Sequence, residues 1–384
     1  MSRLARDWGL TPVQTASGAP SWVRRALLGV TGALVLFGLL SVYSASSFQA
    51  QQAGMPDSYF FVNQLARAVF GAVVLFAATF IDYRVYRRLA WPFLGIVVLL
   101  LLIVLMPGTT GFAPVRNGAR RWIMLGPVSL QPSELAKVAV VIWTATIAVR
   151  KQDCLRTFNK GVQPFLIVLG PVLLLILAEP HLSAALITSG IVAVVLFSAG
   201  ARLRHFALLA GPVLPLLWIQ VRANSYQLRR ILAFINPDLD PDGVGYQLEQ
   251  ATIAIGSGRF FGVGFGESTQ KLYYLPEPQN DFIFPIIAEE WGFIGALAVL
   301  TLFLIWTLMG LRIASSAPDL FGRLLAIGLT SIIAIGAFGH MGITMGMLPT
   351  TGVSLPFISA GGTGLVIAMG ITGVLLNIAS GRRC

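Results

Sequence analysis

Long apolar runs alternate with short polar segments along almost the whole chain. A helix needs about 20 apolar residues to cross a bilayer, and such runs span about 26–45, 63–81, 88–106, 132–149, 162–178, 182–199, 203–221, 282–311, 322–347 and 353–379. This pattern predicts an all-α integral membrane protein with about ten transmembrane helices. Two of the predicted loops are long, namely 107–131 and 222–281, and the second joins the seventh and eighth helices.

The composition excludes an ordinary soluble protein. Of 384 residues, 56% are hydrophobic and 11% are charged, and the mean hydropathy is +0.78. Soluble domains carry about 25% charged residues, so lipid must cover much of this surface. We expect a basic cytoplasmic tail over 1–25, followed by one transmembrane domain over 26–380.

Charge predicts the orientation of the chain. The formal net charge is +11, but the basic residues punctuate the apolar runs and form no face that could read nucleic acid. Counted over alternate loops, they favour a cytoplasmic location for both termini. On that side lie only four of the 16 acidic residues, Asp7, Asp82, Asp153 and Asp319. The prediction is a multi-pass protein in contact with membrane lipids, with no nucleic-acid partner.

The first long loop and the helix after it carry four candidate residues. Arg120 and Arg121 lie in the loop, and Glu134 and Lys137 follow in the first turns of the helix. Because Glu134 and Lys137 are three residues apart, they share a helix face. One interpretation is a capping carboxylate with a lysine that reaches the membrane surface. The other is a polar cavity, since charged groups at membrane depth are costly and usually functional.

The second long loop carries three more candidates. Lys271, Glu277 and Asp281 fall within eleven residues. Asp281 is at the mouth of the eighth helix, where a partly desolvated carboxylate can act as a general base; a helix cap is the alternative. The glycine-rich segment 256–266 lacks the strand and Gly-Lys-Ser/Thr of a phosphate-binding loop. We interpret it as flexible backbone near the membrane surface, and no residues have metal-ligand spacing.

Several segments resemble the SEDS family (shape, elongation, division and sporulation proteins). They are Gln131–Lys137, Gly243–Gln247, Ala254–Gly258, Leu275–Glu277 with Asp281–Phe284, and Leu355–Ser359 with Gly361 and Gly362. The resemblance covers about 26–380. It implies a peptidoglycan glycosyltransferase that polymerises lipid II on the outer face of the bacterial cytoplasmic (inner) membrane.

The resemblance also implies roles for the candidate residues. The essential aspartate of the family falls on Asp281, which would deprotonate the acceptor sugar hydroxyl. The departing pyrophosphate would need cations, and the candidates for lipid II or cavity contacts are Arg120, Arg121, Glu134, Lys137, Lys271 and Glu277. A divalent cation, Mg²⁺ or Mn²⁺, could assist, although the sequence shows no dedicated ligand set.

The segment Ser268–Leu272 resembles the division branch of the family (FtsW) more than the elongation branch (RodA). The expected role is therefore septal cell-wall synthesis, with a class B penicillin-binding protein and other divisome proteins as partners. The alternatives are a lipid II flippase, an elongation polymerase and a non-catalytic scaffold. Four residues depart from the family pattern, namely His181, Asn280, His340 and Ala360.

Overall fold

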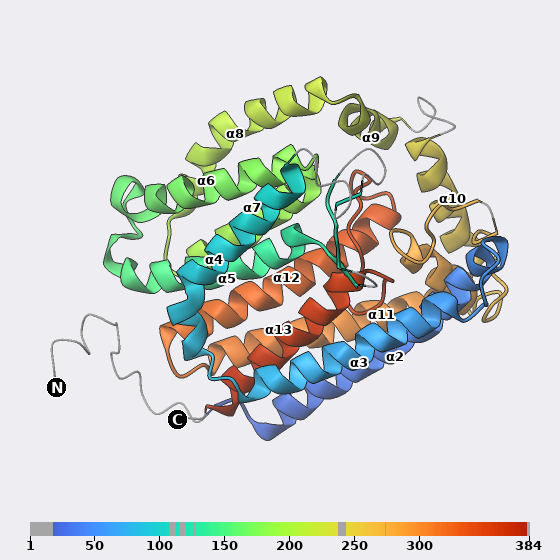
Figure 1. The fold of residues 1–384 in the computed structure, drawn as a ribbon, viewed down its shortest axis with the longest axis horizontal. Helices are drawn as coiled ribbons and strands as arrows, with labels where there is room; N and C mark the ends of the chain where they lie inside the picture. Colours follow the sequence, from blue (N-terminus) through green and yellow to red (C-terminus); the bar gives the residue numbers. More distant parts are fainter. Residues whose placement is uncertain are drawn as a thin grey trace.

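The computed structural model describes residues 18–106, 113–114, 120–125, 128–236, 243–272 and 274–381. In these residues the chain is almost entirely helical (Figure 1). The elements are α2 (Ser21–Gln52), α3 (Tyr59–Phe80), α4 (Arg84–Leu105), β1 (Ile123–Leu125), β2 (Val128–Leu130), α5 (Pro132–Arg150), η2 (Gln152–Cys154), η3 (Phe158–Val162), α6 (Gln163–Ala178), α7 (Leu182–Ser198), α8 (Leu203–Ala223), α9 (Ser225–Ile235), α10 (Val244–Ser257), α11 (Ile283–Ser315), α12 (Leu320–Thr344) and α13 (Gly362–Ser380).

All ten predicted apolar runs contain a helix, which confirms the all-α fold class. Among the described residues, eight helices are long and apolar enough to cross a membrane. α7 is also apolar but has only 17 residues. The count of about ten spans stays a prediction, since these criteria were met or missed by the described residues alone.

Two helix boundaries differ from the predicted ones by more than five residues. α2 extends to Gln52, beyond the predicted end of the first run. α13 begins at Gly362, not at 353, because the preceding residues form a turn in which Phe357 has a positive φ of 64°. Hydropathy did not show this turn, since its side chains are apolar and buried against the bundle.

The two long loops contain secondary structure that the sequence did not predict. The first contains an antiparallel hairpin in which Ile123 of β1 pairs with Leu130 of β2. The second contains α9 and α10, which lie with α8 at the margin of the bundle in Figure 1. The prediction of long loops over 107–131 and 222–281 did not include these short elements. The hydropathy pattern does not detect short elements that lack a long apolar run.

The packed helices include α2, α3, α11, α12 and α13 (Figure 1). α3 and α13 approach closely because Gly373 lies against the Leu75 backbone, where a Cβ would collide. Small residues permit such approaches between membrane helices. At the chain's two ends, Gly18 lies against Gly381. Both ends of the described chain therefore lie at the same end of the bundle.

Basic residues mark that end, which we call the basic end. Arg24 and Arg25 line a pocket of about 470 Å³ there. Arg156, Arg202 and Arg204 line another of about 570 Å³. The opposite end, which we call the site end, holds the hairpin, the start of α5, the α6–α7 turn and the start of α11.

Candidate functional site

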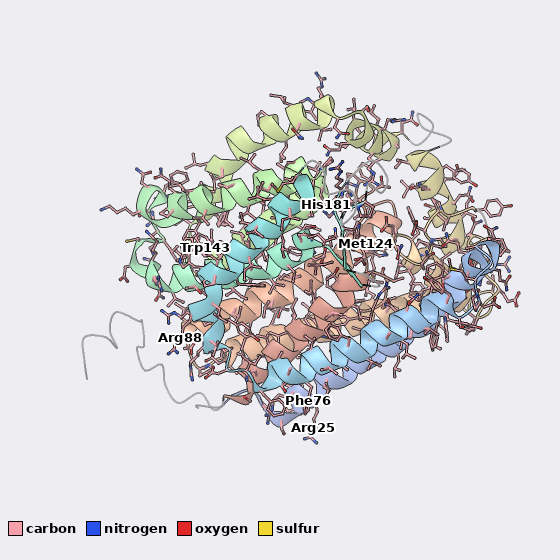
Figure 2. The ribbon with its side chains drawn as sticks, viewed as in Figure 1. Arg25, Phe76, Arg88, Met124, Trp143 and His181 are labelled. Carbon is pink, nitrogen blue, oxygen red and sulfur yellow. The ribbon has the colours of Figure 1, made fainter. Side chains whose placement is uncertain are left out.

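Polar side chains from segments far apart in the sequence gather at the site end. Figure 2 shows Met124 of the hairpin and His181 of the α6–α7 turn toward the site end, whereas Arg25 and Arg88 lie toward the basic end. The candidate site is built between these segments, the residues before α11 and the α12–α13 loop.

Asp281 lies two residues before α11, and the main chain leading to it is fixed by the α12–α13 loop. The Ala360 N–H donates to the Gln279 carbonyl at 3.0 Å. The Ser359 hydroxyl donates to the Asn280 carbonyl at 2.8 Å. This loop therefore holds the backbone of the candidate base, and a change in the loop would move Asp281.

The Asp281 carboxyl group lies beside a glycine in the same loop. A Cβ added to Gly352 would lie 3.4 Å from Oδ2 of Asp281. The neighbouring Val353 carbonyl accepts a hydrogen bond from Nδ1 of His340 at 2.6 Å. A carbonyl only accepts, so Nδ1 of His340 carries the proton. This divergent histidine thus anchors the loop beside Asp281.

The electrostatic environment of Asp281 favours a general base. Partial burial is the main reason that the pKa of the Asp281 carboxyl is raised to about 6, and the charge of Glu277 contributes to this rise. Arg230 and Arg121 act in the opposite direction and lower it. The group can therefore hold a proton in weak acid and remain ionised near neutral pH.

Arg121 joins the α6–α7 turn to this cluster. Its Nε donates to the Glu179 carbonyl at 3.1 Å, and its NH2 group donates to the Pro180 carbonyl at 2.6 Å. The Glu179 side chain is buried, and neither of its carboxylate oxygens has a hydrogen-bond partner among the described residues. Burial raises the pKa of Glu179 to about 8, against a lowering by Arg121, so this carboxyl is mostly neutral at pH 7.

Glu134 and Lys137 form an ion pair at the start of α5. Nζ of Lys137 lies 2.7 Å from Oε1 of Glu134, and the lysine is buried in the protein and does not face lipid. In the α6–α7 turn, Nδ1 of His181 lies 3.3 Å from the Ser133 hydroxyl. Burial lowers the pKa of His181 to about 3, helped by the charges of Arg121 and Lys137. The pair and the histidine therefore belong to the same polar region.

The remaining three candidates, Arg120, Lys271 and Glu277, each have a different hydrogen-bond or ion-pair partner. Glu277 accepts from Nδ2 of Asn280 at 2.6 Å, at the exposed edge of the site. Arg120 donates to the Met106 carbonyl at 3.3 Å. Lys271 is buried in an ion pair with Glu290 at 2.9 Å, and no described contact joins it to Asp281. The structure thus brings Arg121, Glu134, Lys137, Glu277 and Asp281 into one region and does not bring Lys271 there.

Sequence reasoning missed four residues of this region: Glu179, Arg230, His340 as a loop anchor, and Gly352. Arg230 lies in α9, in a stretch read only as loop. In the turn that carries Glu179, only His181 stood out from the sequence. Their places in this region depend on how distant segments pack, and no local pattern carries that information.

The described residues contain no group of three His, Cys, Asp or Glu side chains that could hold a metal ion. Mg²⁺ and Mn²⁺ prefer several oxygen ligands in near-octahedral geometry. Around Asp281 the charged neighbours are one carboxylate, Glu277, and the cations Arg121 and Arg230. These residues do not fit a divalent cation.

Fold and site together define a class of protein, namely a multi-pass helical membrane protein with a buried acid–cation cluster at one end. The family model described as cell cycle protein, for FtsW, RodA and SpoVE, matches residues 24–384. The chain belongs to this family, the SEDS family of the sequence resemblance.

Individual relatives are similar over almost their full lengths. The chain is 42% identical to a probable peptidoglycan glycosyltransferase FtsW of Trichlorobacter lovleyi, over 93% of each chain. It is 40% identical to stage V sporulation protein E of Bacillus subtilis, over 92% of this chain and 96% of that one. Among solved structures, a chain of a peptidoglycan synthase complex that coordinates polymerization and crosslinking matches with a TM-score of 0.75 and 27% identity, over 92% of this chain and 96% of that one. The rod shape determining protein RodA of Thermus thermophilus matches with a TM-score of 0.66 and 27% identity, over 92% and 95%.

Proposed function

We propose that this protein is a peptidoglycan glycosyltransferase that polymerises lipid II, in the branch of its family that serves cell division. The observation that carries the proposal is Asp281, a carboxylate with a raised pKa, fixed backbone and cationic neighbours, in a chain whose relatives include FtsW proteins. The site end then faces outward and the basic end faces the cytoplasm of a bacterial inner membrane, as the charge distribution favours.

The proposed reaction uses Asp281 as its general base. Asp281 takes the proton of the acceptor sugar hydroxyl, and the freed oxygen attacks the anomeric carbon of the donor. The bond between that carbon and undecaprenyl pyrophosphate breaks. Arg121 and Lys137 are the cations of this region best placed to stabilise the negative charge that builds on the pyrophosphate. Arg120, at the edge of the hairpin, is a third candidate.

Glu134 has a supporting role in this proposal. It holds Nζ of Lys137 at 2.7 Å, and a paired lysine keeps a defined position while its remaining N–H groups can contact an anion. Glu277 tunes the base, because its negative charge raises the pKa of Asp281.

The relation to a synthase complex suggests a partner. The solved relative belongs to a complex of polymerization and crosslinking activities. We propose that a class B penicillin-binding protein docks on this chain and supplies the crosslinking activity, at the septum with other divisome proteins. The segment before α11 is a suitable relay, since contacts with a partner could reposition Asp281.

The test uses the full chain in lipid nanodiscs with lipid II, alone and with the partner, and a gel that resolves glycan strands. Wild-type protein should produce strands, and Asp281→Asn should reduce the rate about 10²–10⁴-fold, the usual contribution of a general base. Arg88→Gln, at the basic end, is the matched control and should retain activity. Equal synthesis by the wild type and Asp281→Asn would reject the assignment. Translocation of lipid II without strands would favour a flippase.

A further inference from the structure

α11 is broken close to the candidate base. Gly292 has φ 66° and ψ −165° inside the helix, so residues 283–291 form a separate short segment that directly follows Asp281. A break leaves backbone groups without helical partners. Here the Val263 N–H donates to the Glu289 carbonyl at 3.0 Å, and the Phe293 N–H donates to the Arg259 carbonyl at 2.8 Å. The glycine-rich loop after α10 thus satisfies the groups that the break releases.

Glycine is required on both sides of this contact. Gly262 has a positive φ of 82°, and a Cβ there would collide with the backbone of Glu290 and Gly292. A Cβ on Gly292 would collide with Phe260 and Gly262 in turn. The segment that the sequence suggested to be flexible is therefore locked, backbone to backbone, onto the break in α11.

The two glutamates beside the break extend this lock through their side chains. Glu289 is buried and accepts from the Ser268 hydroxyl at 2.5 Å, the Thr269 hydroxyl at 3.0 Å and the Thr269 N–H at 3.1 Å. Its charge is compensated by three donors from one short segment. That segment lies 12 to 13 residues before Asp281 in the sequence.

Glu290 holds the same segment through an ion pair. Nζ of Lys271 lies 2.9 Å from Oε1 of Glu290, 3.0 Å from the Ser44 hydroxyl and 2.6 Å from the Gly266 carbonyl. An ammonium group has three N–H donors, so these contacts use all of them. The side chains of Lys271 and Glu290 are at most 5% exposed. Lys271 therefore has no donor left for a substrate phosphate.

The segments on both sides of Asp281 in the sequence are held by contacts with the loop after α10 and with the start of α11. From the loop, the Leu275 N–H donates to the Gln270 carbonyl at 3.1 Å. Leu275 then packs with Phe282 and Ile286 in a small apolar cluster that also contains Ala45 of α2 and Ala251 of α10. Asp281 thus lies between two segments that are both fixed to the break.

We propose that Lys271 and Glu290, with Ser44, are positioning residues that hold Asp281 in its working place, and that Lys271 does not bind the pyrophosphate of lipid II. This inference rests on the proposed function for its kinetic readout. It replaces the role that the family resemblance implied for Lys271 as a substrate contact.

Paired replacement separates the two roles. Lys271→Met leaves the Glu290 carboxylate buried without its cation, so kcat should fall at least tenfold while KM stays within about twofold. Lys271→Met with Glu290→Leu removes both charges, and apolar residues of similar volume often replace a buried ion pair without loss. This double variant should recover to within about threefold of wild-type kcat. Arg84→Met, which breaks an ion pair with Asp319 at the basic end, is the control and should leave both constants unchanged.

Hydrogen exchange gives a readout that does not need activity. Amides of 274–283 should exchange at least tenfold faster in Lys271→Met and return to wild-type rates in the double variant. If wild-type protein made no glycan, the proposed function would fail while these exchange rates would still judge the positioning role. If Lys271→Met does not accumulate as folded protein, Ser44→Ala removes one hydroxyl from the same network and should lower kcat about two- to fivefold at unchanged KM.

Three outcomes would overturn the inference. The first is a double variant as inactive as Lys271→Met with a raised KM, which is the behaviour of a lost substrate contact. The second is unchanged exchange of 274–283 in Lys271→Met. The third is a Ser44→Ala variant with wild-type kcat and wild-type exchange.

Discussion

The protonation of Asp281 gives the sharpest prediction for the proposed reaction. A base must be ionised to accept a proton, and burial raises the pKa of Asp281 to about 6. The ratio kcat/KM reports this group in the free enzyme. About nine-tenths of the carboxyl is ionised at pH 7 and about one-tenth at pH 5. We therefore expect kcat/KM to fall about tenfold between these values, with a midpoint near pH 6.

The raised pKa of Asp281 also makes the stability of the folded protein depend on pH. A rise from the ordinary value of 3.8 to about 6 corresponds to about 3 kcal/mol against the ionised form. The folded state binds the proton more tightly than the unfolded chain, so stability decreases as pH rises through this window. Asp281→Asn carries no charge, and its thermal midpoint above pH 6 should therefore exceed that of the wild type while its activity is lost.

Two charged neighbours of Asp281 should move the pH midpoint of kcat/KM in opposite directions. Glu277 raises the pKa of Asp281 and Arg121 lowers it. Glu277→Gln should therefore shift the acidic limb of kcat/KM to lower pH, and Arg121→Gln should shift it to higher pH, whatever either change does to the maximal rate. Because Glu277 is exposed, its shift should shrink in high salt.

The assay is strand synthesis by the full chain in nanodiscs, measured from pH 4.5 to 8.5 at fixed ionic strength with lipid II below KM. Arg88→Gln provides the control profile. A flat profile across pH 5–7 would refute the reasoning, as would shifts of the same sign in the two variants. A midpoint of the kcat/KM profile near pH 4 would show that burial does not set the pKa of Asp281.

Three further predictions concern the surroundings of the base. Lys137→Met should reduce strand synthesis at least tenfold, because the half-buried Glu134 carboxylate loses its cation and the pyrophosphate loses a positive neighbour, whereas Arg88→Met should not; equal rates would remove Lys137 from the site. Gly352→Val should abolish synthesis in a protein with wild-type thermal stability, since its methyl groups would fill the space beside Asp281; an active variant would show that the acceptor approaches from another side. His340→Ala should lower the free energy of unfolding by about 1–3 kcal/mol through the lost buried hydrogen bond, and His340→Asn, which keeps a donor, should recover part of it in thermal melts.

The positions of several site residues follow from local features of the sequence. Glu134 and Lys137 are three residues apart on a helix that begins with Pro132, and that spacing alone places them on one face. Asp281 precedes a long apolar run, so its location at the end of a membrane helix was also readable. The family resemblance supplied its role, and the comparisons support that family.

Lys271 shows where a local reading fails. Its sequence neighbours, Glu277 and Asp281, suggested a shared site, yet the lysine is paired with Glu290 of α11 and Ser44 of α2. A cation in a loop can turn toward several partners, and the packing of the helices decides which one it meets. The glycine-rich segment is a similar case, because only the break at Gly292 converts it from a flexible loop into a fixed one.

The sequence by itself determined the helical membrane fold, the separation of a basic end from a polar end, and the identity of the candidate base. Each of these depends on hydropathy, charge or a motif within one stretch of chain. Only the tertiary structure decided that Arg121 and Arg230 act on the charge of Asp281, and that Lys271 is paired with Glu290 instead. Electrostatic and hydrogen-bond energies fall steeply with distance, so they depend on which segments the fold brings within a few ångströms, and that selection is made by the packing of the whole bundle.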